Sequence, residues 1–303
     1  MHAFIFPGQG SQRPGMGEAW RDTESWSLVK RLSAVTGRDI ERLLVDADAA
    51  ELKVTGNAQL ATFTLSLVIL DAMRARADPP PAAVAGHSLG EYSALVAAGV
   101  LESSEGARLV AARGAAMESA AATHPGTMAA VLGLDPEGVA AACRGVDGAW
   151  VANDNAPGQI VIAGTAAGVE AAGLRARELG AKRVVPLPVG GAFHTPLMGP
   201  AQEGLDVALD DATLGDGSLA CVANVDAEVH TAAGEWRRLL STQLTAPVRW
   251  RQSLTRLSEL GVTTFVELGP GTELSGMVKR TVDGAIRANV AEPDHVSALP
   301  GLD

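Results

Sequence analysis

Ser88 stands in the segment Gly-His-Ser-Leu-Gly, residues 86–90, and its surroundings could make it a nucleophile. An apolar run at 82–85 predicts a strand before the segment, and residues 91–98 predict a helix after it. A sharp, glycine-flanked turn between a strand and a helix exposes a serine hydroxyl near the N–H groups of the helix N-terminus. The alternative is a turn of small residues that contains a serine by chance. The strand–turn–helix context favours the nucleophile.

A serine nucleophile needs a base to remove its proton, and histidine is the usual one. The chain has six histidines. We favour His194, because it lies in a glycine-containing loop at 190–196 where two parts of the fold are expected to meet, and ligand sites favour such junctions. His87 adjoins the serine, but its side chain should leave the turn in another direction. The alternative for His194 is an ordinary surface histidine.

Arg113 is the candidate for binding a negatively charged substrate. The predicted helix that begins near Ser103 places Leu109, Arg113 and Met117 on one stripe, since residues four apart share a face. An arginine in an apolar stripe needs a partner, because an unpaired buried cation is costly. That partner is either an internal Asp or Glu, or a substrate carboxylate held by two parallel hydrogen bonds, unless the side chain extends to the surface.

A second loop could contribute to the same site. Residues 6–12, Phe-Pro-Gly-Gln-Gly-Ser-Gln, follow the first predicted strand and form a glycine-bracketed turn. A tetrahedral intermediate needs two N–H donors, ideally that of the residue after the nucleophile, here Leu89, and one from another loop. A phosphate-binding turn is the alternative, but no Gly-Lys-Ser/Thr follows.

The elements that must position these residues alternate between strands and helices. In the first part we expect strands at 3–6 and 82–85 and helices over 26–44, 58–75, 91–98 and 104–120. This alternation predicts a parallel sheet that is covered on both faces. From residue 219 onward strands and helices alternate again, with strands at 219–224 and 263–268 and helices over 234–244 and 250–260. Residues 289–303 show no pattern and are expected to form a loose tail.

A different order lies between these parts. Residues 127–134, 149–152, 159–163 and 182–189 are expected to be strands, and 135–143 and 168–179 helices. This β-α-β-β-α-β order is typical of a ferredoxin-like unit. We therefore expect an α/β fold in which a small ferredoxin-like subdomain, 127–189, is inserted into an α/β-hydrolase-like large subdomain, 1–126 and 190–303, that has a parallel sheet and carries the nucleophile.

Composition argues against several classes of partner. Of the 303 residues 47% are hydrophobic and 19% charged, and the net charge is −11. The first two values indicate a folded globule, and the charge argues against nucleic acid and anionic membranes. An acidic protein partner would need a local basic patch, for which Lys182-Arg183, Arg249 with Arg251, and Lys279-Arg280 are candidates. Neither cysteine belongs to a metal or redox spacing, no secretory signal or membrane span is evident, and we expect a cytoplasmic protein without a metal.

Taken together, the motifs closely resemble the malonyl-CoA:acyl carrier protein transacylases and the related acyltransferase domains of polyketide synthases. The matching segments occur in the family's order and extend from about residue 4 to 280. They are residues 6–12, residues 86–91 (GHSLGE), Arg113-Gly114 with Met117, Asn153 to Gly164, residues 192–194, Gln243 with residues 247–250, and residues 267–271.

The resemblance implies a role for each candidate residue. Ser88 would be acylated by malonyl-CoA, and His194 would act first as base and then as acid. The backbone N–H groups of Gln9 and Leu89 would form the oxyanion hole, and Arg113 would bind the malonyl carboxylate. A backbone carbonyl near Gln243 would orient the histidine. Met117 and Phe193 would line the pocket for the acyl group.

The implied reaction has no resident cofactor. The acyl group comes from a coenzyme A thioester, and its acceptor is the phosphopantetheine thiol carried by an acyl carrier protein, in fatty-acid or polyketide synthesis. Thr195 and Leu60 depart from the residues common in the family, serine and proline, which leaves room for a specialised member.

Other functions remain open at this point. One is an acyltransferase for another, alkyl-branched malonyl unit, and another is the transacylase component of a malonate decarboxylase. An α/β-hydrolase would place an Asp or Glu between the serine and the histidine, where Asp154 and Glu170 could be claimed. A non-catalytic scaffold would not need serine, histidine and arginine together.

Overall fold

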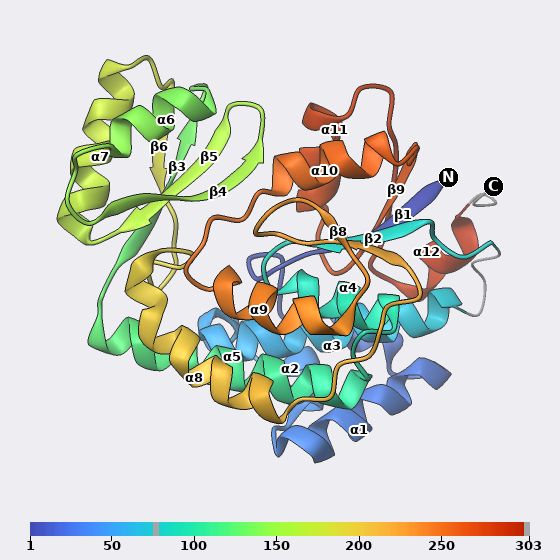
Figure 1. Ribbon diagram of the computed structural model, residues 1–303. Coiled ribbons are helices and arrows are strands. Elements are labelled where there is room, and N and C mark those ends of the chain that lie inside the picture. Colours follow the sequence, from blue (N-terminus) through green and yellow to red (C-terminus); the bar gives the residue numbers. More distant parts are fainter. Residues whose placement is uncertain (75–78, 300–303) are drawn as a thin grey trace.

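The computed structural model describes residues 1–74 and 79–299, which form two β-sheets with helices around them (Figure 1). The larger sheet has the strand order β10-β9-β1-β2-β7-β8. These strands are β10 (Ile286–Val290), β9 (Thr264–Leu268), β1 (His2–Phe6), β2 (Ala83–Gly86), β7 (Ala220–Val222) and β8 (Val229–His230). All neighbours are parallel except β8, which pairs antiparallel with β7. The protein is thus an α/β structure with a mainly parallel sheet.

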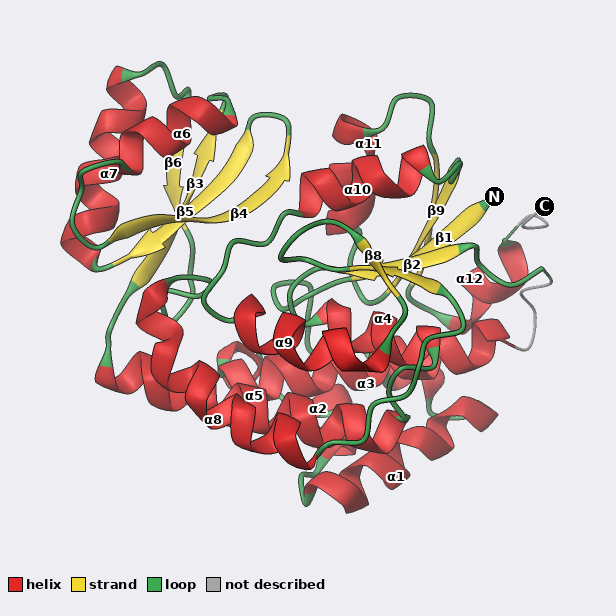
Figure 2. Cartoon of the chain, viewed as in Figure 1, coloured by secondary structure: helices red, strands yellow, loops and turns green. Residues whose placement is uncertain are grey.

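Alternation along β1 divides the core between the two faces of this sheet. Phe4 and Phe6 belong to one buried cluster, while Ala3 and Ile5 belong to another. On the first face pack α3 (Thr55–Arg74), α4 (Gly90–Ala98) and, beyond them, α5 (Ser103–Thr123), together with α1 (Ser27–Thr36), α2 (Ile40–Val45), α8 (Gly199–Asp211) and α9 (Ala233–Gln243) (Figure 2). On the second face lie α10 (Trp250–Glu259) and α11 (Glu273–Thr281). The expected two-sided cover of the sheet is present.

The smaller sheet is antiparallel and has the order β4-β5-β3-β6. It is built from β3 (Thr127–Leu132), β4 (Ala149–Ala156), β5 (Gln159–Gly164) and β6 (Arg183–Pro186), with α6 (Pro136–Cys143) and α7 (Ala166–Glu178). Ile160 and Ile162 face these two helices, whereas Val161 and Met128 face the other way, toward the larger sheet. The face of the small sheet that carries no helix is therefore turned toward the larger sheet and can cover a site.

The C-terminal part differs from its expectation. The prediction of a loose tail over 289–303 is wrong for the described residues, because β10 pairs along β9 and α12 (Pro293–Ala298) packs against α3. Trp20 also donates a hydrogen bond to the Ala291 carbonyl, at 2.9 Å. The edge strand contains Arg287 and Asn289 and is only partly buried, so it lacks the apolar run that marks a central strand. Residues 300–303 lie outside the described residues.

Three helices also differ from the sequence patterns. The single helix expected over 26–44 is two helices, since Gly37 adopts a φ of 65° and ends α1. The patterns did not predict α8 or α11. The N-terminus of α11 is capped by the carboxylate of Glu267, which accepts from the N–H groups of Leu274 and Ser275, so its start depends on a strand rather than on a local capping residue. Ala75, the last residue of the helix expected over 58–75, lies outside the described residues.

No helix in the described part of the chain is both long and apolar enough to cross a bilayer. The same part contains no group of three or more histidine, cysteine or acidic side chains that could hold a metal ion.

Candidate active site

Ser88 sits in the sharp turn between β2 and α4, with a left-handed backbone φ of 51°. Such a conformation costs a serine about 1–3 kcal/mol and persists only where the surroundings impose it. The glycines on either side explain how the turn fits. A Cβ on Gly86 would lie 1.9 Å from the Gly90 backbone, and a Cβ on Gly90 would lie 2.1 Å from the Phe6 carbonyl oxygen. The chain therefore needs glycine at both positions to pass this close to itself and to β1.

Asn224, just after β7, fastens the turn from the neighbouring strand. Its side-chain oxygen accepts from the Ser88 N–H, and its amide nitrogen donates to the Gly86 carbonyl, both at 2.7 Å. The side chain is fully buried. Sequence reasoning missed this residue, because nothing near Asn224 in the sequence marks it as a neighbour of residues 86–88.

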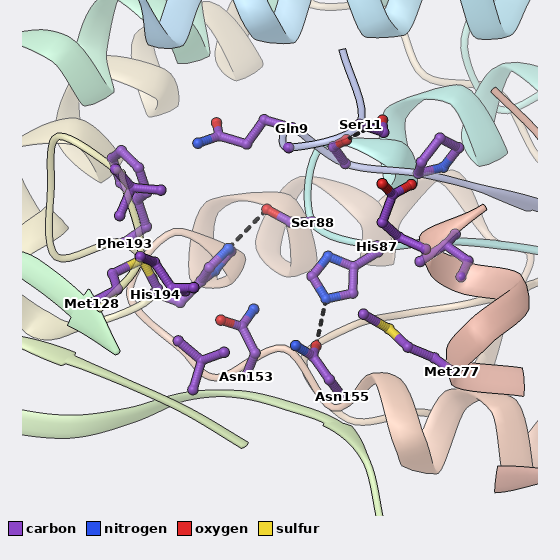
Figure 3. A pocket seen from close by; sticks show the side chains of 18 of the residues that line it. Gln9, Ser11, His87, Ser88, Met128, Asn153, Asn155, Phe193, His194 and Met277 are labelled. Carbon is purple, nitrogen blue, oxygen red and sulfur yellow. Dashed lines mark hydrogen bonds between the residues drawn. The ribbon is translucent and has the colours of Figure 1, made fainter. Parts of the chain in front are cut away.

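His194 meets the serine from the loop that leaves the small sheet. Its Nε2 lies 2.8 Å from the Ser88 Oγ, and its Nδ1 lies 2.8 Å from the backbone carbonyl oxygen of Gln243 (Figure 3). A carbonyl can only accept, so Nδ1 carries the proton and Nε2 is left to accept the serine proton. His194 also has a positive φ, 61°. Burial and the nearby Arg113 cation lower its pKa to about 3, so it is neutral at physiological pH.

Arg113 lies fully buried on α5 and makes its hydrogen bonds with neutral oxygens. Nη1 donates to Gln59 Oε1 at 2.7 Å, and Nη2 donates to Ser88 Oγ and to Gln243 Oε1, each at 3.0 Å. Its guanidinium carbon lies 5.7 Å from the centre of the Tyr92 ring. None of the ion pairs among the described residues contains Arg113, so the acidic partner weighed from the sequence does not contact it directly, although the charge of the buried Glu91 is near enough to act on its pKa. A guanidinium that makes no direct ion pair can bind the carboxylate of a substrate.

The two expected backbone donors flank the serine. Leu89 directly follows it at the N-cap of α4, and Gln9 lies in the loop after β1, where its side chain accepts from Gln59 Nε2 at 3.1 Å. In residues 1–74 and 79–299 no hydrogen bond engages the N–H of Gln9 or of Leu89. Gly8 brings that loop against the turn, since a Cβ there would lie 2.7 Å from the His87 carbonyl oxygen.

A pocket opens over these groups, between the larger sheet and the free face of the smaller one. Asn153 and Asn155 on β4 lie on the side opposite Gln9, and Phe193 and Met128 lie near His194 (Figure 3). His87 points away from the serine and contacts Asn155 Oδ1 through Nε2 at 2.8 Å. The pocket is also lined by Pro7, Gly8, Gly10, Ser11, Met117, Val161, Leu187, Val189, Glu273, Leu274 and Met277. The sequence-predicted site residues that line this largely apolar pocket are Gln9, Ser88, Met117, Phe193 and His194. Leu89, Arg113 and Gln243 are buried and are not among its lining residues.

The acidic residues that a hydrolase would need are placed elsewhere. Asp154 pairs with Arg251 at 2.7 Å and also accepts from Gln252. Glu170 is exposed on α7. Because the Gln243 carbonyl occupies Nδ1 of His194, neither carboxylate can take the third position of a Ser-His-acid triad.

The model of the acyl transferase domain family matches residues 3–297, and the chain belongs to this family. It is 43% identical over 302 residues to the malonyl CoA-acyl carrier protein transacylase of Bacillus subtilis (strain 168), covering 97% of this chain and 94% of that one.

Solved structures agree with this assignment. An acyl-carrier-protein S-malonyltransferase from Burkholderia pseudomallei 1710b matches with a TM-score of 0.93 and 38% identity over 98% of each chain. A structure of a type II polyketide-synthase acyl carrier protein in complex with its malonyl-transacylase matches with a TM-score of 0.93 and 36% identity, also over 98% of each chain. The protein is therefore an acyltransferase, and it is similar to malonyl transacylases over nearly its whole length.

Proposed function

We propose that this protein transfers a malonyl group from malonyl-CoA to the phosphopantetheine thiol of an acyl carrier protein, through an ester on Ser88. The observation that carries the proposal is that one atom, Ser88 Oγ, contacts both the neutral imidazole of His194 and the guanidinium of Arg113. The first contact provides the base for an acyl transfer. The second supports binding of an acyl group that carries a carboxylate, because a cation lies beside the nucleophile.

In the first half-reaction, Ser88 Oγ attacks the thioester carbonyl carbon while its proton moves to Nε2 of His194. The N–H groups of Gln9 and Leu89 stabilise the negative charge that develops on the carbonyl oxygen. When the tetrahedral intermediate collapses, the C–S bond breaks, and the proton on Nε2 goes to the departing coenzyme A sulfur. The second half-reaction reverses these steps, with the carrier-protein thiol as the attacking group.

Arg113 selects the acyl group by exchanging one of its hydrogen bonds for the malonyl carboxylate. Met117 and Phe193 line the remaining space, and Gln59 Nε2 lies 3.2 Å from the Met117 sulfur. An acetyl group would leave the buried cation without a carboxylate, which is costly.

The two parts of the fold divide this work. We assign residues 1–126 and 190–303 to an α/β-hydrolase-like subdomain that holds Ser88, and 127–189 to a ferredoxin-like subdomain that covers the pocket. The assignment is supported by the element order, since all four strands of the small sheet and both of its helices fall within 127–189.

Intact-mass measurement tests the proposal. The protein is incubated with malonyl-, methylmalonyl-, acetyl- and succinyl-CoA, and the acyl adducts are weighed. We expect a malonyl adduct that disappears when a phosphopantetheine-bearing carrier protein is added and reappears on that protein. Release of free malonate at a rate unaffected by carrier protein would instead show a hydrolase. An adduct from methylmalonyl-CoA alone would show a transferase for a branched unit.

Two basic pairs that are far apart in the sequence are linked through the small sheet. Arg183 and Gln159 both pair with Leu132 in the small sheet, and Arg280 on α11 donates a hydrogen bond to Gln159 Oε1. Lys182 and Lys279 adjoin these arginines and are exposed. An acidic carrier protein can dock at such a cationic patch even though the whole chain is negatively charged.

Replacing Lys182, Arg183, Lys279 and Arg280 by glutamate should raise the apparent KM for carrier protein about tenfold or more, since rim charges govern association. The rate of self-acylation at saturating malonyl-CoA should not change. Lys30→Glu, on α1 at the other face of the sheet, is the matched control and should change neither (Figure 1). An unchanged KM in the fourfold variant would place carrier-protein docking elsewhere.

Acidification from about pH 7.5 to about pH 5 should leave the single-turnover acylation rate nearly constant, whereas a base of ordinary pKa would lose about thirtyfold. The reason is that burial and Arg113 hold the pKa of His194 at about 3, so the imidazole stays neutral over this range. Removing the cation in Arg113→Ala should raise the pKa of His194 and move the acid limb to higher pH. The pH dependence of the Arg113→Ala variant is measured with acetyl-CoA, and circular dichroism checks the fold at each pH. An acid limb near pH 6.5 in the unchanged protein would contradict the prediction.

A further inference from the structure

Glu91 is a fully buried carboxyl group that the acyl transfer described above does not use. It is the second residue of α4 and lies behind the turn that carries Ser88. Its Oε1 accepts from the backbone N–H of Asn224 at 2.7 Å, and its Oε2 accepts from Nε2 of Gln243. Burial raises the pKa of Glu91 to about 8, and both donors and the Arg113 cation oppose that rise. Because each of its oxygens faces an N–H donor, a proton on either oxygen would meet a donor, so both oxygens act as acceptors in this arrangement.

Gln243 connects the Glu91 carboxyl group to Ser88, Arg113 and His194. Its Nε2 donates to the Ser88 carbonyl at 2.9 Å as well as to Glu91, and its Oε1 accepts from Arg113 Nη2 at 3.0 Å. Its backbone carbonyl accepts from Nδ1 of His194 at 2.8 Å. The side chain is itself buried, so water does not replace these bonds.

The two ends of the Gln243 amide are not interchangeable here. If the amide turned over, its NH2 group would face the Arg113 donors, and its oxygen would face the Ser88 carbonyl and the Glu91 carboxyl group. The amide would then set a donor against the Arg113 donors and an acceptor against the Ser88 and Glu91 oxygens. The Glu91 oxygen therefore favours the orientation in which Gln243 presents its own oxygen to Arg113.

We propose that Glu91 is a positioning residue, which fixes the Gln243 amide and through it the direction of the Arg113 guanidinium. This inference rests on the proposed function, because it gives Arg113 the task of binding a substrate carboxylate. It makes acyl-group selectivity depend on a side chain that touches neither substrate nor nucleophile.

Glu91→Gln tests the inference with almost no change of shape. The oxygen of the new side-chain amide can still accept from the Asn224 N–H, but its NH2 group faces Nε2 of Gln243. Either this contact is then lost, or the Gln243 amide turns its NH2 toward Arg113. We expect the ratio of malonyl to acetyl self-acylation rates to fall at least about tenfold, mainly through the malonyl rate. Both rates are measured by intact mass, and thermal unfolding checks the fold.

Asn224→Ala is the matched control, because it weakens the same turn without touching the Gln243 amide. It removes the bonds to Ser88 N–H and Gly86 O but keeps the backbone donor to Glu91. We expect both rates to fall in parallel, with their ratio unchanged. A purely structural Glu91 would behave in the same way. A parallel loss of both rates in Glu91→Gln, or no loss, would therefore overturn the inference.

Gln243→Leu keeps the inference testable if Glu91→Gln does not fold. It removes the amide and retains the backbone carbonyl that orients His194, so the ratio should fall as it does in Glu91→Gln. An unchanged ratio in Gln243→Leu would exclude the relay, whatever the Glu91 variants do. The proposed function itself would fail differently, through an unchanged protein that forms no malonyl ester or does not distinguish malonyl from acetyl groups.

Discussion

Ser88→Ala should form no covalent malonyl-enzyme, and carrier-protein malonylation should fall to the uncatalysed level. The hydroxyl is the atom that His194 and Arg113 both contact, at 2.8 and 3.0 Å, and the other groups in the pocket are arranged around it. Without it His194 has no proton to remove, and the ping-pong route is closed. The measurement is the intact mass of the protein after incubation with malonyl-CoA, followed by peptide mapping of the adduct in the unchanged protein.

Ser93→Ala is the matched control for that experiment. Ser93 is also a buried serine on α4, one turn beyond the nucleophile, and it is not among the residues that line the pocket. We expect this variant to acquire the malonyl group at the rate of the unchanged protein. An adduct that survives in Ser88→Ala would move the nucleophile to another residue and would remove the basis for the roles given to His194 and Arg113.

Arg113→Ala should lower malonyl self-acylation by about 10²–10⁴-fold, the cost of leaving a buried carboxylate without its partner. Acetyl self-acylation, which never used that ion pair, should change far less, so the selectivity of the protein should collapse. Both rates are compared under the same single-turnover conditions. A variant in which the two fall equally would make Arg113 a structural residue that supports Ser88.

Arg113→Lys separates charge from geometry in this prediction. A lysine keeps the cation but cannot hold Gln59 Oε1 and Gln243 Oε1 at the same time while reaching toward the acyl group, because its donors radiate from one nitrogen. We expect an intermediate loss of malonyl transfer. Full activity in Arg113→Lys would show that a point charge is sufficient and that the planar fork is not used.

The parts of the site that could be predicted from the sequence are those with a local signature. The turn around Ser88 has glycines and flanking elements within a few residues of it, and Arg113 shows itself as a cation within an apolar helical stripe. In the structure Ser88, His194, Arg113 and Gln243 form one hydrogen-bonded network, and the role of each residue stays a prediction. The choice of His194 among six histidines gains most of its support from the family resemblance. The backbone role at Gln243 rests on that resemblance alone, because a main-chain contact leaves no mark on residue type.

The parts that could not be predicted depend on contacts between distant segments. Asn224 holds the turn from 136 residues away, and Glu267 caps a helix that has no capping residue of its own. The edge strand β10 has no strand pattern in its sequence, because partial burial permits polar residues there. In each case the decisive partner lies outside the window in which periodicity and capping patterns operate.

The backbone carbonyl that accepts from His194 affects how long the proposed ester on Ser88 persists. A main-chain carbonyl gives the ring less help in taking up a proton than a carboxylate would, and Arg113 opposes the uptake further. A thiol ionises far more readily than water, so the carrier-protein thiol needs less help from this weak base than a water molecule does. We therefore expect the proposed ester on Ser88 to react faster with the carrier-protein thiol than with water.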